Sequence, residues 1–181
     1  MVIVQTPRLE LVPLPPPLVA ALVRGDLAAA QALAPFPVDS GTFAGDEHVL
    51  GLRHAQLTAD PTEEPWLFRA AVERASGRVI GKVGFHAPPD ADGAVEIGYR
   101  VGEPHRRQGY AYEMAVGLIR WGAEQGARTC IASVRPDNEP SLRIVERLGF
   151  RRTGEQMDDI DGLEWVFELP LTALPSYDER R

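Results

Sequence analysis

The feature that most constrains the fold of this chain is a long amphipathic helix expected between two short strands. Residues 94–101 before the helix and 129–134 after it have the pattern of strands. Residues 109–126 between them place apolar and small side chains at the spacing by which a helix buries one face. These side chains are Ala111, Met114, Ala115, Leu118, Ile119 and Gly122. The pattern predicts an α/β domain in which helices pack on a sheet.

The rest of the chain adds strands and helices on both sides of this unit. A helix over 139–148, ended by Gly149, should follow it and lead into a hairpin of 151–157 with 163–169. Upstream we expect strands over 8–14, 66–72 and 78–85 and helices over 18–24 and 46–57, the second burying Val49, Leu50, Leu52 and Leu57. The order predicts one α/β domain around a mixed sheet, with about four helices.

Length and composition indicate a single soluble domain. The chain has 181 residues, and we expect one domain over 1–181, with a core from about 6 to 170 and a tail over 171–181. The longest apolar run, 18–23, has six residues, against about 18 for a membrane span. No signal peptide is visible, and Cys130 is the only cysteine, which excludes an internal disulfide. These features predict a cytoplasmic protein.

The charge balance disfavours some partners. There are 26 acidic and 19 basic residues, a net charge of −7, and Lys82 is the only lysine. Binding to nucleic acid needs a basic face, so we expect no nucleic-acid partner. The four histidines show no metal-ligand spacing, so we expect no metal.

The segment Arg106-Arg-Gln-Gly-Tyr-Ala111 lies between a strand and the long helix. The N–H groups of a helix start lack intrahelical partners and sit at the positive end of the dipole, so they bind phosphate. Gly109 would let the backbone approach a ligand closely, and the two arginines add charge. The alternative is a solvated arginine loop that caps the helix.

A second segment, Pro136-Asp-Asn-Glu-Pro-Ser141, precedes the next helix. Asn138 has the position of an N-cap, the commonest role of such an asparagine. Alternatively, Asn138 and Ser141 point at a ligand, since open α/β sheets bind ligands at the carboxyl ends of strands.

The motifs taken in order resemble the GNAT superfamily of acyl-CoA-dependent N-acetyltransferases. They are Glu96-Ile-Gly-Tyr-Arg-Val, Arg106-Arg-Gln-Gly-Tyr-Ala, Asn138-x-x-Ser141 and Glu146-Arg-Leu-Gly-Phe150. Thr6-Pro-Arg-Leu9 further resembles the branch of ribosomal-protein N-terminal (alanine/serine) acetyltransferases. The likeness spans residues 6 to about 170. It implies a single GNAT-like domain with a mostly antiparallel sheet whose middle strands splay apart.

The resemblance also implies acetyl-CoA, or another acyl-CoA, as the cosubstrate. In the family, the matching loop cradles the pyrophosphate, the pantetheine arm binds the free strand edge near Val101, and the residue matching Asn138 contacts that arm or CoA. The residues implied to bind the cofactor are Tyr99, Val101, Arg106, Arg107, Gln108, Gly109, Tyr110, Ala111, Asn138 and Ser141.

Two residues are implied to act in catalysis. Glu96 matches a carboxylate that serves as base in many relatives, the alternative being a glutamate in solvent on the strand face. Many relatives carry a tyrosine seven residues after the asparagine to protonate the thiolate, but Val145 stands there in this chain. Ser141 is the candidate replacement, unless it only orients CoA or caps its helix. Tyr99 and Tyr110 cannot be placed from sequence.

The resulting hypothesis is an N-acetyltransferase that moves acetyl directly from acetyl-CoA to a primary amine, on a protein N-terminus or a small molecule. The acidic hairpin with Asp158, Asp159, Asp161 and Glu164 would attract a cationic acceptor or is simply solvated. The runner-up is a non-catalytic acyl-CoA-binding sensor or interaction module. Exposed sheet edges would suit a homodimer.

Overall fold

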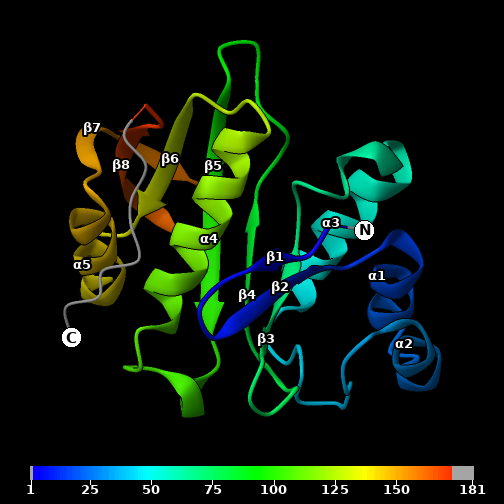
Figure 1. Ribbon diagram of the computed structural model, residues 1–181. Coiled ribbons are helices and arrows are strands. Elements are labelled where there is room, and N and C mark those ends of the chain that lie inside the picture. The colour runs from blue at the N-terminus through cyan, green and yellow to red at the C-terminus, as the bar shows by residue number, and fades with distance from the viewer. Residues whose placement is uncertain (1, 173–181) are drawn as a thin grey trace.

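An open sheet of eight strands runs through the computed structural model, which describes residues 2–172 (Figure 1). Its order is β1-β2-β3-β4-β5-β6-β8-β7, and every neighbouring pair is antiparallel except β5 and β6. The strands are β1 (Val4–Gln5), β2 (Leu9–Pro13), β3 (Arg69–Glu73), β4 (Val79–Phe85), β5 (Ala94–Val101), β6 (Thr129–Val134), β7 (Arg151–Asp158) and β8 (Gly162–Pro170). The predicted mixed, mostly antiparallel sheet is confirmed.

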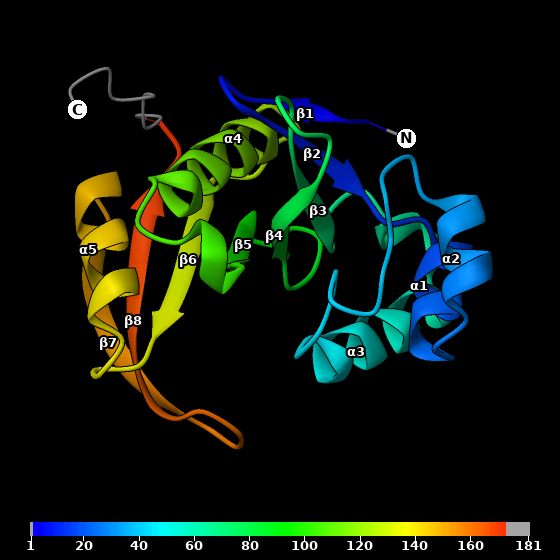
Figure 2. The ribbon, with the colours of Figure 1, turned by 90° about the horizontal axis from the view of Figure 1, so that it is seen from below.

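Helices cover both faces of the sheet. They are α1 (Pro16–Val23), α2 (Leu27–Leu33), α3 (Glu47–Ala59), α4 (Tyr110–Glu124) and α5 (Glu139–Leu148), with short 3₁₀ turns at Pro61–Glu63 and Glu103–His105. Side chains of β2 alternate between two apolar clusters: Leu9 and Leu11 pack with α4, whereas Val12 packs with the first three helices. Figure 2 shows α4 on one face, and α3 on the other, where the β7–β8 turn also projects.

Most predicted elements are confirmed, three of them to the residue: 94–101, 129–134 and 139–148. The sequence missed β1 and α2; α2 reads LAAAQAL and buries only Ala30, so it carries no helical periodicity. Leu52, predicted to be buried in α3, is 48% exposed, because it lies outside the narrow stripe of that helix that Leu50 and Leu57 bury. The expected tail over 171–181 lies outside the described residues apart from its first two positions.

The two middle strands separate, as the family resemblance implies. β5 and β6 pair in parallel through only three positions, Ala94 with Thr129, Val95 with Cys130, and Glu96 with Ile131. Beyond them β5 stays paired with β4 to Val101, and β6 stays paired with β8 to Val134. Each strand therefore follows its outer neighbour, and a gap opens between them.

A buried carboxylate fastens the first turn of α4 to the entrance of β2. Glu113 accepts hydrogen bonds from the Thr6 hydroxyl at 2.6 Å, the Arg8 amide at 2.7 Å and the Arg8 Nε at 2.6 Å. Arg8 also donates through Nη1 to the carbonyl of Gln108 at 3.0 Å. Because Gln108 lies in the loop before α4, this network fixes that loop as well as the helix.

Within residues 2–172, no helix has the length and apolar character needed to cross a membrane.

Removing the Glu113 carboxylate should destabilise the fold. We expect Glu113→Ala to lower the free energy of unfolding by about 2–4 kcal/mol, because the buried Thr6 hydroxyl and the part-buried amide and guanidinium of Arg8 lose their acceptor. Urea denaturation measures the change. Glu124→Ala, at an exposed position on the same helix, is the matched control. A loss below about 1 kcal/mol would contradict this role of the network.

Candidate functional site

The gap between β5 and β6 contains a cavity of about 240 Å³. Its walls come from both separated strands, from the start of α5 and from the β7–β8 hairpin. The lining residues are His86, Ile97, Gly98, Tyr99, Ala132, Ser133, Val134, Arg135, Asn138, Ser141, Asp161 and Glu164. The splay thus brings together residues that are far apart in the sequence.

One edge of β5 has no strand beside it along this cavity. The Glu96 carbonyl accepts from the His86 amide at 2.8 Å, and the Gly102 amide donates to the Ile80 carbonyl at 2.9 Å. Since bonded positions alternate along an antiparallel ladder, the backbone groups of Ile97 and Tyr99 point the other way, toward β6. β6 has already diverged there. An extended ligand with amide groups can therefore pair with this edge as an added strand would.

Tyr99 presents a buried hydroxyl on the α4–α5 side of the gap. The ring packs against the cluster around α4. The hydroxyl has no hydrogen-bond partner within residues 2–172, although Ser141 lies close enough to act on its pKa. Burial raises the pKa of Tyr99 to about 12, so the group keeps its proton at neutral pH. A protonated, buried hydroxyl at a cavity wall can donate a proton or a hydrogen bond to a group bound in that cavity.

Asn138 caps α5, as one of the two sequence interpretations proposed. Its side-chain oxygen accepts from the Ser141 amide at 3.3 Å. Both residues also line the cavity, so capping and ligand contact are compatible. The cap fixes where the Ser141 hydroxyl lies relative to Tyr99.

Glu96 lies on the opposite face of the sheet, the side of α3. Its Oε2 is 3.6 Å from His86 Nδ1, and the side chain is 30% exposed. The neighbouring His86 imidazole, and then the Ser133 hydroxyl, lower the pKa of Glu96 despite its partial burial. The carboxylate is therefore ionised and paired, rather than free in solvent on the strand face.

Sequence reasoning missed His86 as a site residue. The spacing of the histidines in the sequence fits no metal site, so it gives His86 no role. The available signal was its position directly after the strand predicted over 78–85, because an antiparallel neighbour places that position opposite Glu96.

The loop before α4 has the backbone geometry expected of an anion site. Arg107 has a φ of 60° and Gly109 a φ of 79°, and Arg107 is the only non-glycine residue among positions 2–172 with positive φ. The first helical bond at this end is donated by the Glu113 amide to Gly109, at 3.1 Å. No side chain caps the helix, so the amides of its first turn remain available.

Two residues of this loop point elsewhere. The Tyr110 hydroxyl donates to Glu73, and Arg8 lies over its ring at 4.2 Å, so the side chain is structural and only its backbone amide belongs to the loop. Arg106 donates through Nε to the Val101 carbonyl at 3.3 Å. Its side chain thereby occupies the carbonyl at the end of the β5 edge.

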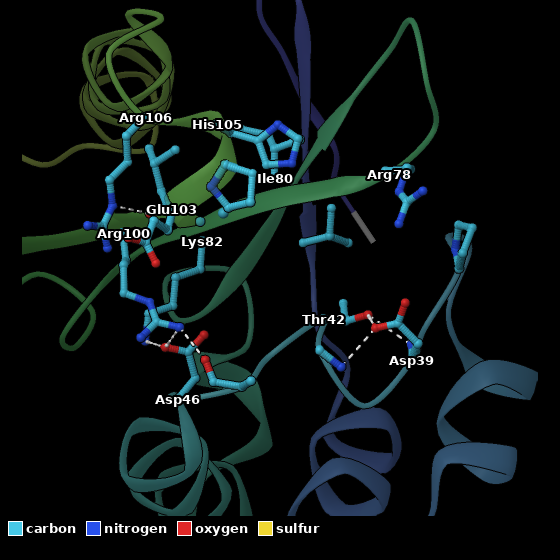
Figure 3. A pocket seen from close by; sticks show the side chains of 18 residues that line it. Asp39, Thr42, Asp46, Arg78, Ile80, Lys82, Arg100, Glu103, His105 and Arg106 are labelled. Carbon is cyan, nitrogen blue, oxygen red and sulfur yellow. Dashed lines mark hydrogen bonds and ion pairs between the residues drawn. The ribbon is translucent and has the colours of Figure 1, made fainter.

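A larger cavity of about 710 Å³ lies beside this loop on the α3 side of the sheet (Figure 3). Lys82 and Arg100 point toward Asp46, whose Oδ1 lies 2.6 Å from Lys82 Nζ and 3.2 Å from Arg100 Nη2. Burial of Lys82 lowers its pKa even though Asp46 opposes that shift. The ion pairs neutralise Asp46 and fasten the loop before α3 to the sheet. Glu96, Tyr99, Asn138 and Ser141 do not line this cavity.

Cys130 does not contribute a nucleophile. Its side chain is fully buried in β6, and burial raises the pKa of the thiol far above neutral pH. Within the described part of the chain, no three His, Cys, Asp or Glu side chains come together in a way that could hold a metal ion.

The protein-family model described as "Acetyltransferase (GNAT) domain" matches residues 8–151. The chain is 36% identical over 80 residues to the uncharacterized N-acetyltransferase YjdG of Bacillus subtilis (strain 168), covering 44% of this chain and 48% of that protein. It is 32% identical over 84 residues to the uncharacterized N-acetyltransferase p20 of Bacillus licheniformis, covering 46% and 47%. The matched region spans about half the length of these relatives.

Solved structures share the fold. A putative ribosomal-protein-serine acetyltransferase from Vibrio cholerae superposes with a TM-score of 0.65 at 22% identity, covering 93% of this chain and 97% of that chain. A ribosomal-protein-S5-alanine acetyltransferase from Vibrio fischeri gives a TM-score of 0.64 at 17% identity, covering 97% and 100%. At these identities the likeness establishes the fold alone.

Proposed function

The chain belongs to the acetyltransferase (GNAT) family, and on that premise we propose that it is an acyl-CoA-dependent N-acyltransferase that transfers acetyl from acetyl-CoA to a primary amine. The observation that carries the proposal is a set of three neighbouring features within residues 2–172: the β5 edge that β6 leaves, the buried Tyr99 hydroxyl beside it, and the start of α4, which no side chain caps.

Acetyl-CoA fits the groups that the structure leaves unsatisfied. The amides from Arg107 to Ala111 would hold the pyrophosphate, with Arg106 and Arg107 adding positive charge. The pantetheine arm carries amide groups, and the backbone of Tyr99 would pair with them along the free edge. Asn138, whose side-chain nitrogen is not used by the cap, would contact the same arm. The thioester would then lie in the cavity between β5 and β6.

The sheet separates the two proton-transfer tasks. An amine must lose a proton before it attacks the thioester, and the departing thiolate must gain one. The carboxylate of Glu96 and its neighbour His86 lie on the α3 side, whereas the hydroxyls of Tyr99 and Ser141 lie on the α5 side. The amine would enter from the first side and add to the thioester carbon. Collapse of the resulting oxyanion would break the C–S bond and leave the CoA thiolate to be protonated from the second side. Backbone N–H groups of β5 near Tyr99 would stabilise the oxyanion.

For the acceptor, we favour a protein N-terminus over a small-molecule amine. The support is the Thr6-Pro-Arg-Leu9 motif, whose threonine and arginine bind Glu113 in this chain, and the names of structural neighbours that act on ribosomal proteins. The alternative, a non-catalytic acyl-CoA-binding module, predicts cofactor binding without transfer to any amine. An assay of acetyl transfer from acetyl-CoA to serine- and alanine-initiated peptides, spermidine and a primary alkylamine distinguishes the two hypotheses. Acetylation of any of these amines supports the enzyme, and binding of acetyl-CoA without acetylation supports the binding module.

Gly109→Ala should weaken acetyl-CoA binding about tenfold, because alanine strains at positive φ and turns the loop amides away from the phosphates. Isothermal titration calorimetry measures the affinity. Gly126→Ala is the matched control: it has a φ of 100°, an open surrounding, and lies beyond the other end of α4. Equal effects of the two variants would mean that the loop does not hold the cofactor.

Tyr99→Phe should lower kcat about 100-fold while leaving the KM for acetyl-CoA nearly unchanged, because it removes only a hydroxyl that donates to the leaving thiolate. Steady-state release of CoA thiol measures both constants. If Ser141→Ala abolishes turnover while Tyr99→Phe does not, Ser141 rather than Tyr99 is the proton donor.

A further inference from the structure

Resting on the proposed function, we propose that His86 is the general base that takes the proton from the acceptor amine, and that Glu96 is a positioning residue that acts through it. The inference starts from which side chain reaches the cavity. His86 lines the cavity in the splay, and Glu96 does not. The His86 side chain is 50% exposed and that of Glu96 is 30% exposed, so the imidazole is the more accessible of the two groups to an incoming amine.

The two nitrogens of the imidazole face different surroundings. Nδ1 is 3.6 Å from Glu96 Oε2. Nε2 lies over Gly98, where an added Cβ would be 3.0 Å from it. Gly98 is itself part of the cavity wall. Nδ1 is therefore turned to the carboxylate and Nε2 to the cavity wall at Gly98, beside which the amine would arrive in this proposal, the arrangement of a histidine oriented by an acid.

Backbone contacts hold His86 in this position. Its amide donates to the Glu96 carbonyl at 2.8 Å. Its carbonyl accepts from Arg53 Nη1 and from Gln56 Nε2, each at 2.9 Å. Both donors belong to α3, so the helix on the acceptor side fixes the residue directly. A side chain at position 98 would displace the ring, which gives glycine a steric role there.

The charges around the pair suit this division of roles. Glu96 stays ionised because the adjacent imidazole lowers its pKa, which makes it a weaker proton acceptor but a good counter-charge. The proton would pass from the ammonium nitrogen to Nε2, the Nδ1–H would donate to Glu96, and the proton would then leave to solvent. The free electron pair on the amine nitrogen forms the new N–C bond.

Other charged groups face the imidazole from the elements around it. Asp158 of β7 interacts with His86 through space, and Arg53 of α3 sits at its carbonyl. Asp161 and Glu164 of the hairpin and Arg135 after β6 line the same cavity. Carboxylates outnumber cations here, which favours both the approaching ammonium group and the imidazolium that forms.

The test compares His86→Gln, Glu96→Gln and the double variant in acetyl transfer to the amines named above, between pH 6 and pH 9.5. His86→Gln should lower kcat/KM about 100-fold at pH 7. The loss should shrink as the pH rises, because the free amine then loses its proton without help. Glu96→Gln should cost less, and adding it to His86→Gln should cost nothing further, since Glu96 acts only through His86. His48→Gln, an exposed histidine on α3, is the control and should match the wild type.

A wild-type rate in His86→Gln, together with a large loss in Glu96→Gln, would overturn the inference and make Glu96 the direct base. Calorimetry with acetyl-CoA on each variant checks that the cofactor site is intact. If the wild type binds no acetyl-CoA or acetylates none of the amines, the proposed function itself fails, and the role of His86 fails with it. If the wild type acetylates an amine and His86→Gln does so at the same rate, the role of His86 is overturned while the proposed function stands.

Discussion

The three-position parallel pairing between β5 and β6 is the constraint on which the rest of the site depends. Beyond that pairing, β5 is held by β4 from Ile97 to Val101 and β6 by β8 to Val134, so each strand follows its antiparallel neighbour and the gap stays open. The result is a free edge on β5, whose unpaired N–H and C=O groups form a template for pairing with another extended chain or ligand. A ligand that pairs like a strand supplies what the sheet lacks.

Strand alternation then decides which side chains serve which side of the gap. Glu96 and Gly98 lie on the α3 side of the sheet. Tyr99 lies on the other side, where it packs near α4 and lines the cavity with the start of α5. The carboxylate–imidazole pair and the protonated hydroxyl are thus held on opposite faces by the two-residue period of one strand. The Glu113 network adds the third part, since Arg8 holds the Gln108 carbonyl and with it the loop at the end of the same strand. A cofactor lying along the edge would meet all three.

Sequence reasoning predicted the elements whose pattern is local and strong. The β5, β6 and α5 ranges follow from apolar periodicity and from Asn138 and Gly149 at the two ends of the helix. It missed α2, because a run of alanines shows no apolar face at helical spacing. It wrongly predicted Leu52 to be buried, because α3 packs on other helices and buries only a narrow stripe of its surface. His86 and the Tyr99 hydroxyl depend on register across strands, which only the three-dimensional structure gives. The family motifs predicted a cofactor-binding role for the loop before α4, and the structure shows the positive φ of Arg107 and Gly109 in it.

Hydrogen exchange with mass spectrometry, in the presence and absence of acetyl-CoA, tests the central claim most directly. If the cofactor completes the β5 edge, saturating acetyl-CoA should slow exchange at residues 97–101 and 107–112 together, and leave β7 unchanged. Protection confined to residues 37–46 and 78–82, around the larger cavity, would contradict the account, because it would place the cofactor on the α3 side and outside the splay.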